Sequence, residues 1–406
     1  MKEHLKRVAK VFTGTTPPTN ISRYYNTEDV LWFSPGDIPS DGIEPSEPRR
    51  ISKSFFDECG INYYPAHSVL MVGIGATVGK VGYSDRPFYT NQQINTIVFD
   101  ERKVLPKFGA YYLLNKSNEI NKKTPIVTLQ IFNQSKVKQV LIEYPSLSEQ
   151  QRIVNYLDAK IAAIDERIGV LEKQQDAYAR LKKSIIHQAV TRGLNPNVPL
   201  KDSGIEWIGM IPEHWEVKRF KSIFSECKSV TETGKEDLLS VSEYYGIARR
   251  IDKMEDGEYE SRADSLIGYK ICKKDDLVIN IMLAWKRGLG FSDYDGIVSP
   301  AYAVYRGKNI VPHYFHYLMR TDMYVAEYKR NSKGIIDSRL RMYTDRFNNI
   351  IAIVPPLYEQ QSIAAYLDEK CAKIDAATEN IGKQIDASKR LKRALINEVI
   401  TGQRAV

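Results

Sequence analysis

Residues suited to metal or redox centres are scarce in this sequence. Four of its 406 residues are cysteine and six are histidine. No two cysteines stand at the short spacing that zinc sites and redox-active thiols use. We therefore expect four reduced thiols and no metal site. The thiols are those of Cys59, Cys227, Cys272 and Cys371.

The common catalytic motifs are missing as well. There is no pattern of a Ser, His and Asp triad and no HExxH helix. Asn195-Pro196-Asn197 does not match the loop of amino-methyltransferases, which continues with a second proline and an aromatic residue. His313 and His316 lie three residues apart on an expected helix without an acidic or cysteine partner nearby in sequence, which favours a core or surface role over metal binding. These absences favour a binding protein over an enzyme.

Long apolar runs are also lacking. No run approaches the roughly 18 residues of a membrane span, and the start MKEHLKRVAK has no signal-peptide core. We expect a cytoplasmic protein without membrane contact, with room for two or three domains. The net charge of +8 suits a polyanionic partner such as nucleic acid, although many basic proteins have none.

The most informative feature that is present is an internal repeat. Residues 147–191 recur at 357–401 without a gap, at a constant shift of 357 minus 147, or 210, residues. About 21 of about 45 aligned positions are identical, which is far above chance. A repeat of this length predicts two copies of one structural element.

Both copies carry a stripe of mostly apolar residues at alternating spacings of four and three. Such a stripe is typical of a coiled coil, although a surface helix packed on a globular core stays an alternative. Each helix is expected to be about 65 Å long at about 1.5 Å per residue, so its natural partner is the other copy. The stripe consists of Leu157, Ile161, Ile164, Ile168, Leu171, Gln175 and Tyr178 in the first copy and Leu367, Cys371, Ile374, Thr378, Ile381, Ile385 and Ser388 in the second.

The ends of the first helix are also marked. Ser148 and Gln151 fit a capping box, and Gly193 follows the last periodic residue. The charged segments of the two helices are expected on solvated faces, or else in contact with partners or DNA. These segments contain Arg180, Lys182 and Lys183, and Lys389, Arg390, Lys392 and Arg393.

The remainder of the chain predicts two mixed α+β domains. Val69 to Val72 and Ile94 to Phe99 read as strands, and Phe108 to Asn115 reads as a helix. The two globular stretches share weak similarities, HLKR at 4–7 with HWEVKR at 214–219 and GKVGYSD at 79–85 with RGLGFSD at 287–293. We expect a first domain at 1–146, a first helix at 147–192, a connector at 193–206, a second domain at 207–356 and a second helical region at 357–406.

An antiparallel helix pair is favoured, because a parallel pair would force the connector to travel back about 65 Å. The two halves would then be related by an approximate two-fold axis, with one globular domain at each end of the pair.

Candidate binding residues lie near turns of both domains. The run VGIGATVGKVG at 72–82 does not match a phosphate loop, and a tight turn between two strands is favoured over close approach to DNA phosphates. Consecutive amides near residue 92 could make the paired hydrogen bonds that distinguish adenine. A solvated surface role remains the alternative for each. The candidates are Lys80, Thr90, Asn91, Gln92, Gln93, Lys122 and Lys123 in the first domain, and Tyr244, Arg249, Arg250, Lys286, Arg287, Lys333, Arg339 and Arg341 in the second.

Four stretches resemble the specificity subunit of Type I restriction and modification enzymes. They are PSLSEQQRIVNYLD at 145–158, PPLYEQQSIAAYLD at 355–368, RLKKSIIHQAVTRGL at 180–194 and KDSGIEWIGMIPEHWEVKR at 201–219. The resemblance covers the whole chain, with specific helical and connector motifs and recognition domains that match only in outline. One departure is that the N terminus has no copy of the IPEHW lead-in, so the first domain is expected to dock differently on the helix ends.

This resemblance implies a function. The chain would have no catalytic activity and no cofactor of its own. It would recruit two methyltransferase subunits that methylate adenine, and restriction subunits that depend on ATP; S-adenosylmethionine, ATP and Mg are expected on those partners. Each domain would read one half of a bipartite double-stranded DNA site, and the helix pair would set the gap between the halves.

Two alternatives stay open. A coiled-coil scaffold, or an orphan DNA-binding subunit that directs no modification, would bind DNA only through salt-sensitive phosphate contacts. A self-contained methyltransferase is disfavoured by the missing motif. If the domains read DNA, replacing Lys286 and Arg287 by alanine is expected to weaken binding through the second half-site more than through the first.

Overall fold

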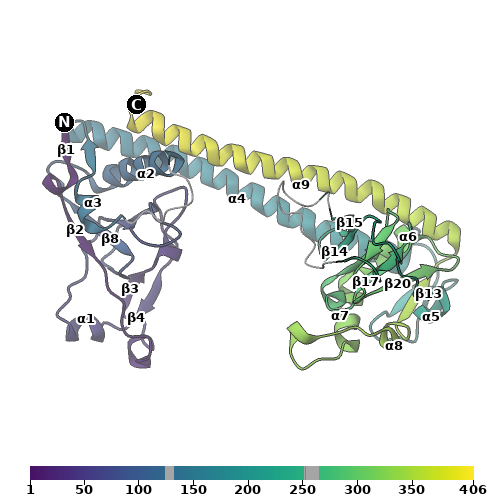
Figure 1. The fold of residues 1–406 in the computed structure, drawn as a ribbon. Coiled ribbons are helices and arrows are strands. Elements are labelled where there is room, and N and C mark those ends of the chain that lie inside the picture. Colours follow the sequence, from purple (N-terminus) through teal and green to yellow (C-terminus); the bar gives the residue numbers. More distant parts are fainter. Residues whose placement is uncertain (124–131, 251, 253–264) are drawn as a thin grey trace. The chain divides into compact units, whose positions relative to one another are not determined.

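A computed structural model of the chain describes residues 1–123, 132–250, 252 and 265–406, without the side chains of 118–123 and of Ser338. Its contacts divide the chain into two units. Unit 1 comprises Met1–Lys173 with Ile381–Val406, and unit 2 comprises Gln174–Asn380. Each long helix therefore contributes a segment to both units (Figure 1).

Unit 1 contains an antiparallel four-stranded sheet of order β2-β8-β5-β6, a three-stranded sheet of order β4-β3-β7 and the pair β1-β9. The expected strands and the expected helix of this domain are confirmed by β5, β8 and α2. The elements are β1 (Lys2–His4), β2 (Ala9–Thr13), β3 (Val30–Phe33), β4 (Arg49–Ile51), α1 (Ser54–Glu58), β5 (Ser68–Val72), β6 (Val81–Ser84), β7 (Tyr89–Thr90), β8 (Ile94–Phe99), α2 (Pro106–Lys123), α3 (Gln134–Lys138) and β9 (Leu141–Glu143).

Unit 2 contains a second four-stranded sheet, of order β13-β20-β17-β18, with the pairs β10-β11, β12-β21, β14-β15 and β16-β19. Its elements are β10 (Leu200–Asp202), β11 (Met210–Pro212), β12 (Glu216–Arg219), α5 (Phe220–Ile223), β13 (Phe224–Cys227), β14 (Leu239–Ser242), β15 (Gly246–Arg249), β16 (Lys270–Cys272), β17 (Leu277–Asn280), β18 (Leu289–Phe291), β19 (Gly296–Val298), β20 (Tyr302–Gly307), α6 (Pro312–Met319), α7 (Asp322–Asn331), α8 (Thr344–Phe347) and β21 (Ile351–Val354).

The two units repeat one topology. The strands of the two four-stranded sheets correspond in chain order, and β1-β9 corresponds to β12-β21. The backbone N–H of Leu5 donates to Val140, and that of Phe220 donates to Ile350 in the same way. His4 therefore corresponds to Arg219 and not to His214, so the sequence alignment of HLKR with HWEVKR was wrong in register.

Each unit encloses its own hydrophobic core. In unit 1 all five residues of β5 are buried, because this strand lies between two others. Phe108 of α2 packs in the same cluster as Val69 and Met71 of β5. In unit 2 the core includes many aromatic side chains, among them the fully buried Trp215, Tyr314 and Phe347. Full burial of one such side chain contributes roughly 1.5–3 kcal/mol.

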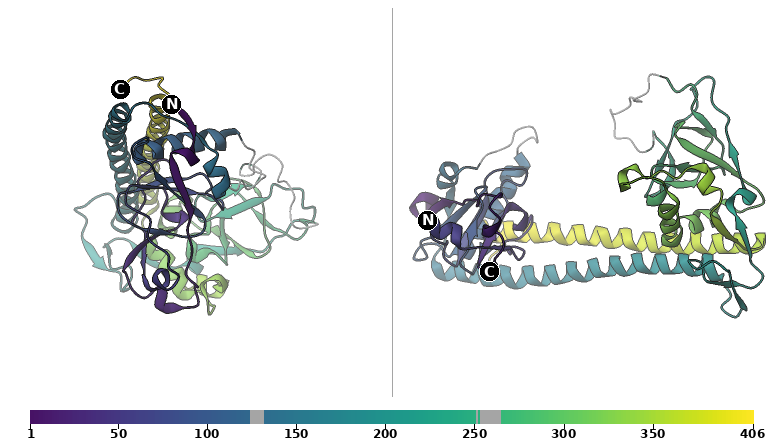
Figure 2. Two further views of the ribbon diagram at one scale, coloured as in Figure 1. Left: turned by 90° about the vertical axis from the view of Figure 1, so that its left-hand side faces the viewer. Right: turned by 90° about the horizontal axis from the view of Figure 1, so that it is seen from below.

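The long helices are α4 (Leu147–Arg192) and α9 (Leu357–Ile400). Within each unit their segments lie side by side, as Figures 1 and 2 both show. In unit 2 Lys182 pairs with Asp375, while Gln175 further back in α4 reaches Thr378 further on in α9. The segments therefore run antiparallel, as the sequence predicted.

Most positions of the predicted stripe are buried. The exceptions are Ile164, Gln175, Tyr178 and Thr378, which are half-buried. The buried members are Leu157, Ile161, Ile168, Leu171, Leu367, Cys371, Ile374, Ile381, Ile385 and Ser388.

The expected cap of α4 was wrong by two residues. The hydroxyl of Ser146 accepts the backbone N–H of Glu149 at 3.3 Å, whereas Ser148 lies inside the first turn. Gln151 donates to Asn155 instead of closing a capping box. At the other end Gly193 takes a left-handed φ of 75°, as a glycine after a helix end is expected to do.

The four cysteines are free, as predicted. Within the residues that the structure describes, no helix is both long and apolar enough to cross a membrane. Among the same residues no group of three His, Cys, Asp or Glu side chains is placed to hold a metal ion.

Candidate nucleic-acid interface

A buried glutamine fixes each unit to the start of its own long helix. Gln150 is 0% exposed; its amide donates to the carbonyls of Lys103 and Pro145 and its oxygen accepts the N–H of Leu105 at 2.8 Å. Leu105 is the residue before α2, so the contact holds the beginning of that helix. A buried side chain with all these groups satisfied is expensive to replace.

Unit 2 repeats this junction. Gln360, which is Gln150 shifted by 210 residues, donates to Pro355 at 2.8 Å and accepts the N–H of Val311 at 2.9 Å. Val311 is the residue before α6. The repeated motif therefore places the same side chain against the same element in both units.

About two turns of helix further on, a repeated aspartate completes the junction. Asp158 accepts the hydroxyl of Tyr111 at 2.7 Å and pairs with Lys107 at 2.9 Å. Its counterpart Asp368 accepts the hydroxyl of Tyr317 at 2.8 Å, and His313 lies 3.2 Å from its other oxygen. His313 thus makes a junction contact, in line with the predicted core or surface role.

The junctions change the titration of both tyrosines. Burial raises the pKa of Tyr111, and the hydrogen bond to Asp158 raises it further. Burial and then Asp368 raise the pKa of Tyr317 in the same way. Both hydroxyls therefore stay protonated and keep donating to their carboxylates at physiological pH.

Sequence reasoning missed this junction, although a signal for it exists. Gln150 and Asp158 are identical in both repeat copies, although Gln150 is a polar residue at a position of the apolar stripe and Asp158 lies off it. The partner segments PKFGAY at 106–111 and PHYFHY at 312–317 share the proline, a basic residue after it and the tyrosine. Polar residues that are the same in both copies are not needed for an apolar stripe. They indicate a second contact on the same helix.

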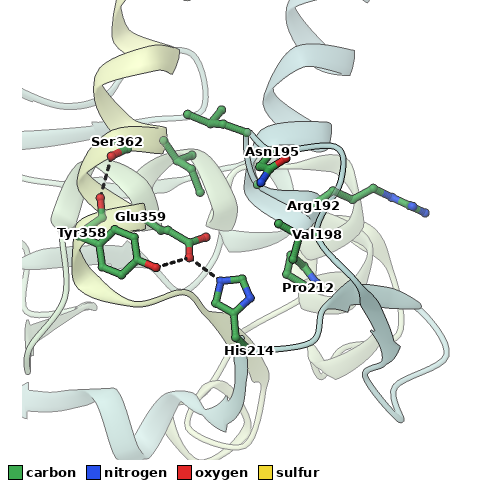
Figure 3. A pocket seen from close by; sticks show the side chains of 11 residues that line it. Arg192, Asn195, Val198, Pro212, His214, Tyr358, Glu359 and Ser362 are labelled. Carbon is green, nitrogen blue, oxygen red and sulfur yellow. Dashed lines mark hydrogen bonds and ion pairs between the residues drawn. The ribbon is translucent and has the colours of Figure 1, made fainter.

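The IPEHW segment has a separate role at the start of α9. Trp215 donates to Glu359 at 2.9 Å. His214 and Tyr358 also bond this carboxylate (Figure 3). Burial alone would raise the pKa of Glu359, but these hydrogen bonds outweigh it and hold the pKa below its usual value. A pocket of about 420 Å³ lies beside this cluster. The counterpart Glu149 in unit 1 is exposed, so the two helix starts differ.

In unit 1 the glycine-rich run forms the turn between β5 and β6, as favoured from the sequence. Lys80 at the end of this turn donates to the carbonyl of Ile38 at 3.1 Å and is half-buried. Ile74 at the start of the turn is 41% exposed. The turn therefore presents an apolar side chain as well as a basic one.

The amide run of unit 1 is divided between interior and surface. Thr90 and Asn91 are buried, and both ends of the Asn91 amide bond Gln93. Gln92 is exposed and bonds the hydroxyl of Thr16. Only Gln92 and the half-buried Gln93 are placed to meet a ligand.

The helical candidates of unit 1 are only partly described. Lys122 and Lys123 end α2, but their side chains lie outside the described residues. The segment that follows them, 124–131, lies outside the described residues too.

The basic candidates of unit 2 fall into structural and exposed groups. Arg287 donates to the carbonyl of Arg320 and pairs with Asp322, so it holds the turn after β17. Lys286 beside it is exposed, with its ammonium 5.0 Å from the ring of Trp285. Of this pair, only Lys286 presents its charge outward.

Three further candidates lie near β15. Arg249 pairs with Asp237 at 3.4 Å and stacks over Tyr294, and Arg250 is half-buried. Tyr244 is 84% exposed. Tyr244 is thus the most accessible aromatic candidate of unit 2.

A pocket of about 620 Å³ between α4 and the rest of unit 2 brings Tyr244 together with Arg287 and Arg320. The guanidinium of Arg320 donates to four backbone carbonyls, those of Arg287, Leu289, Glu243 and Tyr244. Burial lowers the pKa of Arg320 to about 10, and it lowers that of the adjacent His316 to about 4. The guanidinium therefore joins two backbone segments, 243–244 and 287–289.

The last three candidates lie on one loop. Lys333 and Arg341 pair through two backbone hydrogen bonds of 3.0 and 2.9 Å, and Arg339 is exposed between them. The structure thus gathers these three cations on a single projecting segment between α7 and α8 (Figure 1).

The helix lysines differ from the expectation of solvated charge. Lys392 is only 5% exposed and bonds both oxygens of Asp165 at 2.7 Å. Lys182, its repeat counterpart, pairs with Asp375, the counterpart of Asp165. The prediction that Lys392 lies on a solvated face was wrong. This lysine is four residues after Ser388 and therefore continues the buried stripe.

Comparison with known proteins gives consistent matches. Residues 2–173 match the family model described as Type I restriction modification DNA specificity domain. The chain is 22% identical over 354 residues to the Type I restriction enzyme EcoBI specificity subunit of Escherichia coli, covering 82% of this chain and 73% of that protein. It is 26% identical over 355 residues to the putative type I restriction enzyme MjaX specificity subunit of Methanocaldococcus jannaschii, covering 80% and 75%.

Two solved structures share the fold. One comes from work on complex assembly and conformational transition of the type I R-M system, with a TM-score of 0.68 at 14% identity over 98% of this chain and 97% of that chain. The other is the HsdS subunit from Thermoanaerobacter tengcongensis, with a TM-score of 0.51 at 15% identity over 100% and 97%. At these identities the likeness concerns the fold alone.

Proposed function

We propose that the chain belongs to the family of Type I restriction-modification specificity subunits, which it resembles in sequence, and that it is the DNA sequence-specificity subunit of such a complex. Each unit reads one half of a bipartite, asymmetric site. Base edges in the grooves supply the sequence information, while lysine and arginine contacts to phosphates fix the position of each reader.

One observation carries this proposal: two readers of the same topology are anchored to repeated helices by the same residues. Gln150 and Gln360 hold the starts of α2 and α6, and Asp158 and Asp368, about two turns further along the long helices, hold the same two helices. The candidate contact residues, by contrast, are not repeated; Gln92 and Gln93 have no amide counterparts among the candidates of unit 2. A constant anchor with variable surfaces suits two readers of different half-sites.

The chain itself is proposed to be non-catalytic. It would recruit two methyltransferase subunits, which carry S-adenosylmethionine and methylate adenine, and restriction subunits that use ATP and Mg. None of these cofactors is assigned to residues of this chain. The repeated helices are the natural docking elements for two like partners, since they present the same motif twice.

We assign the spacing of the half-sites to α4 and α9. They run without a break for 46 and 44 residues, which corresponds to roughly 65 Å at about 1.5 Å per residue. A stiff rod of this kind can hold two readers no more than about two turns of DNA apart, at about 34 Å per turn.

The direct test is to co-express the chain with a methyltransferase subunit from the same source and to map methylated adenines across the host genome by single-molecule sequencing. A bipartite motif with a fixed gap is the expected result, and it would reveal both half-sites at once. A host that expresses the methyltransferase subunit alone is the control.

A stable complex that adds no methylation would contradict the proposal. The chain would then be a coiled-coil scaffold or an orphan DNA-binding subunit, and its DNA affinity would depend on salt without preference for sequence. Methyl transfer by the purified chain alone would contradict the assignment as a non-catalytic subunit.

A further inference from the structure

The loop between α7 and α8 has a fixed base. Lys333 and Arg341 exchange two backbone hydrogen bonds, and the N–H of the next residue, the buried Met342, donates to the carbonyl of Ile281 at 2.8 Å. Gly334 has a φ of 156°, and a Cβ there would lie 2.6 Å from the carbonyl oxygen of Arg339. The loop is therefore tied to the end of β17 and closed too tightly for a side chain at Gly334.

The tip of this loop is apolar and uncovered. Ile335 is 101% exposed, the highest value among the large hydrophobic side chains described, and Ile336 beside it is 53% exposed. Tyr343, just beyond the base, is 46% exposed. Single exposed hydrophobic residues are ordinary, but two adjacent ones on a braced, projecting loop indicate a contact with a partner.

The surroundings of the tip are cationic. Lys333 and Arg339 are exposed on the loop itself, and Arg341 closes its base. The one acidic residue of the loop, Asp337, is paired with Lys329 at 2.9 Å. A surface that combines a small apolar tip with positive charge on both sides complements a partner with an anionic exterior and an apolar interior.

Duplex DNA has this character, because its phosphates flank grooves in which stacked bases and methyl groups are reached. A protein partner is a poorer match, because two isoleucines cover far less than the roughly 1,000 Å² that a stable protein interface buries. Apolar wedges of isoleucine, leucine or phenylalanine between base steps are a known mode of groove binding.

We propose that Ile335 and Ile336 enter a groove of the half-site read by unit 2 and open one base step there, while Lys333 and Arg339 contact the flanking phosphates. This inference rests on the proposed function. It adds a specificity element, since pyrimidine-purine steps open more readily than others and the wedge would favour them at that position.

The test uses the complete complex with its methyltransferase subunits and duplexes that carry the mapped site. The fluorescent base 2-aminopurine replaces adenines one at a time through the second half-site and its flanks. Binding of the wild-type complex is expected to brighten the probe several-fold at one step, because the probe is quenched by stacking. The target adenine serves as internal control, since methyltransferases turn their target base out of the stack.

The variant Ile335→Ser/Ile336→Ser is expected to lose the brightening at that step, to keep it at the target adenine, and to bind the site about tenfold more weakly. Ile267→Ser removes another exposed isoleucine of unit 2, 62% exposed, and is expected to behave as wild type. Gel filtration should show the same assembly for all three proteins.

Brightening confined to the target adenine, or retained in the double variant, would overturn the proposal. Loss of methyltransferase subunits with unchanged stacking would also overturn it, because the tip would then be a protein contact. If the wild-type complex binds no site specifically, the proposed function itself is contradicted. The inference about Ile335 and Ile336, which rests on that function, is then contradicted as well.

Discussion

The side-chain oxygen of Gln360 accepts the backbone N–H of Val311 at 2.9 Å, one residue before α6 begins at Pro312. Proline at the first helical position has no N–H of its own, so the N–H before it is the natural place for an external anchor. Gln150 repeats the contact with Leu105 before Pro106. In both units one buried amide thus helps to fix the orientation of the globular part on its long helix.

The first prediction concerns this amide. Gln150→Ala and Gln360→Ala are each expected to destabilise the protein by about 1–3 kcal/mol, because backbone groups that the amide satisfied stay buried without a partner. Gln151→Ala and Gln361→Ala are matched controls, since these neighbouring glutamines are exposed. Urea unfolding measures the difference, and equal losses at the buried and exposed positions would contradict the junction.

The second prediction concerns the two interhelical ion pairs. Lys392 with Asp165 and Lys182 with Asp375 are repeat counterparts, but the side chain of Lys392 is 6% exposed and that of Lys182 is 32% exposed. Double-mutant cycles to alanine are expected to give a coupling of about 1–2 kcal/mol for the first pair and less than about 1 kcal/mol for the second. Equal couplings would mean that burial does not decide the strength of these pairs.

The third prediction is a pH dependence. Burial and the nearby Arg320 and His313 lower the pKa of His316 to about 4, from an ordinary 6.5, although Asp368 opposes them. Between these values the unfolded chain binds a proton that the folded chain does not, so stability falls as the pH drops from about 6.5 toward about 4. From pH 7 to pH 5 this group should cost up to about 2 kcal/mol.

The measurement is the urea midpoint of the wild type and of His316→Gln at both pH values. The variant is expected to show a smaller difference between them, whatever its stability at pH 7. His187→Gln, which changes an exposed histidine of the same unit, should keep the full difference. An unchanged difference in His316→Gln would exclude this histidine as the cause.

The fourth prediction separates two adjacent cations. Lys286→Ala is expected to weaken DNA binding through the second half-site more than through the first, without a change in unfolding. Arg287→Ala is expected to lower stability by about 1–2 kcal/mol, because its guanidinium ties the turn to Arg320 and Asp322. Binding to duplexes with one half-site scrambled, together with thermal unfolding, distinguishes them. Equal loss at both half-sites for Lys286→Ala would indicate general phosphate attraction.

The periodic parts of this structure could be predicted from the sequence, since a coiled-coil stripe repeats at short range. The same stripe, continued by four residues from Tyr178 and Ser388, reaches Lys182 and Lys392. Their charge favoured solvated faces for both, which was wrong for the buried Lys392. A polar residue at such a position often specifies the register of a helix pair, and the buried Lys392 fits that role.

The tertiary contacts could not be predicted in the same way. Gln150 meets Leu105 across 45 residues, and Asp158 meets Tyr111 across 47, so no local pattern links them. The helix-capping rules also failed at the start of α4, because Ser146 and Ser148 satisfied them equally. Among the binding candidates, burial removed Thr90 and Asn91 from the accessible surface, which the sequence of amides alone could not show.

The last prediction tests the helices as the element that sets the gap. Val170–Asp176 and Asn380–Asp386 are repeat counterparts, and the division between the two units falls within both segments. Removing both deletes one heptad from each helix, which preserves the phase of the stripe and shortens each helix by about 10 Å. The tolerated gap should shrink by about three base pairs, at about 3.4 Å each, while both half-sites stay the same. Methylation of a library with every gap length over one turn of DNA measures the shift.

A length-neutral control replaces the exposed Glu172 and Lys173 by alanine and should leave the gap unchanged. If the deletion variant still methylates sites only at the original gap, the helices do not set the spacing.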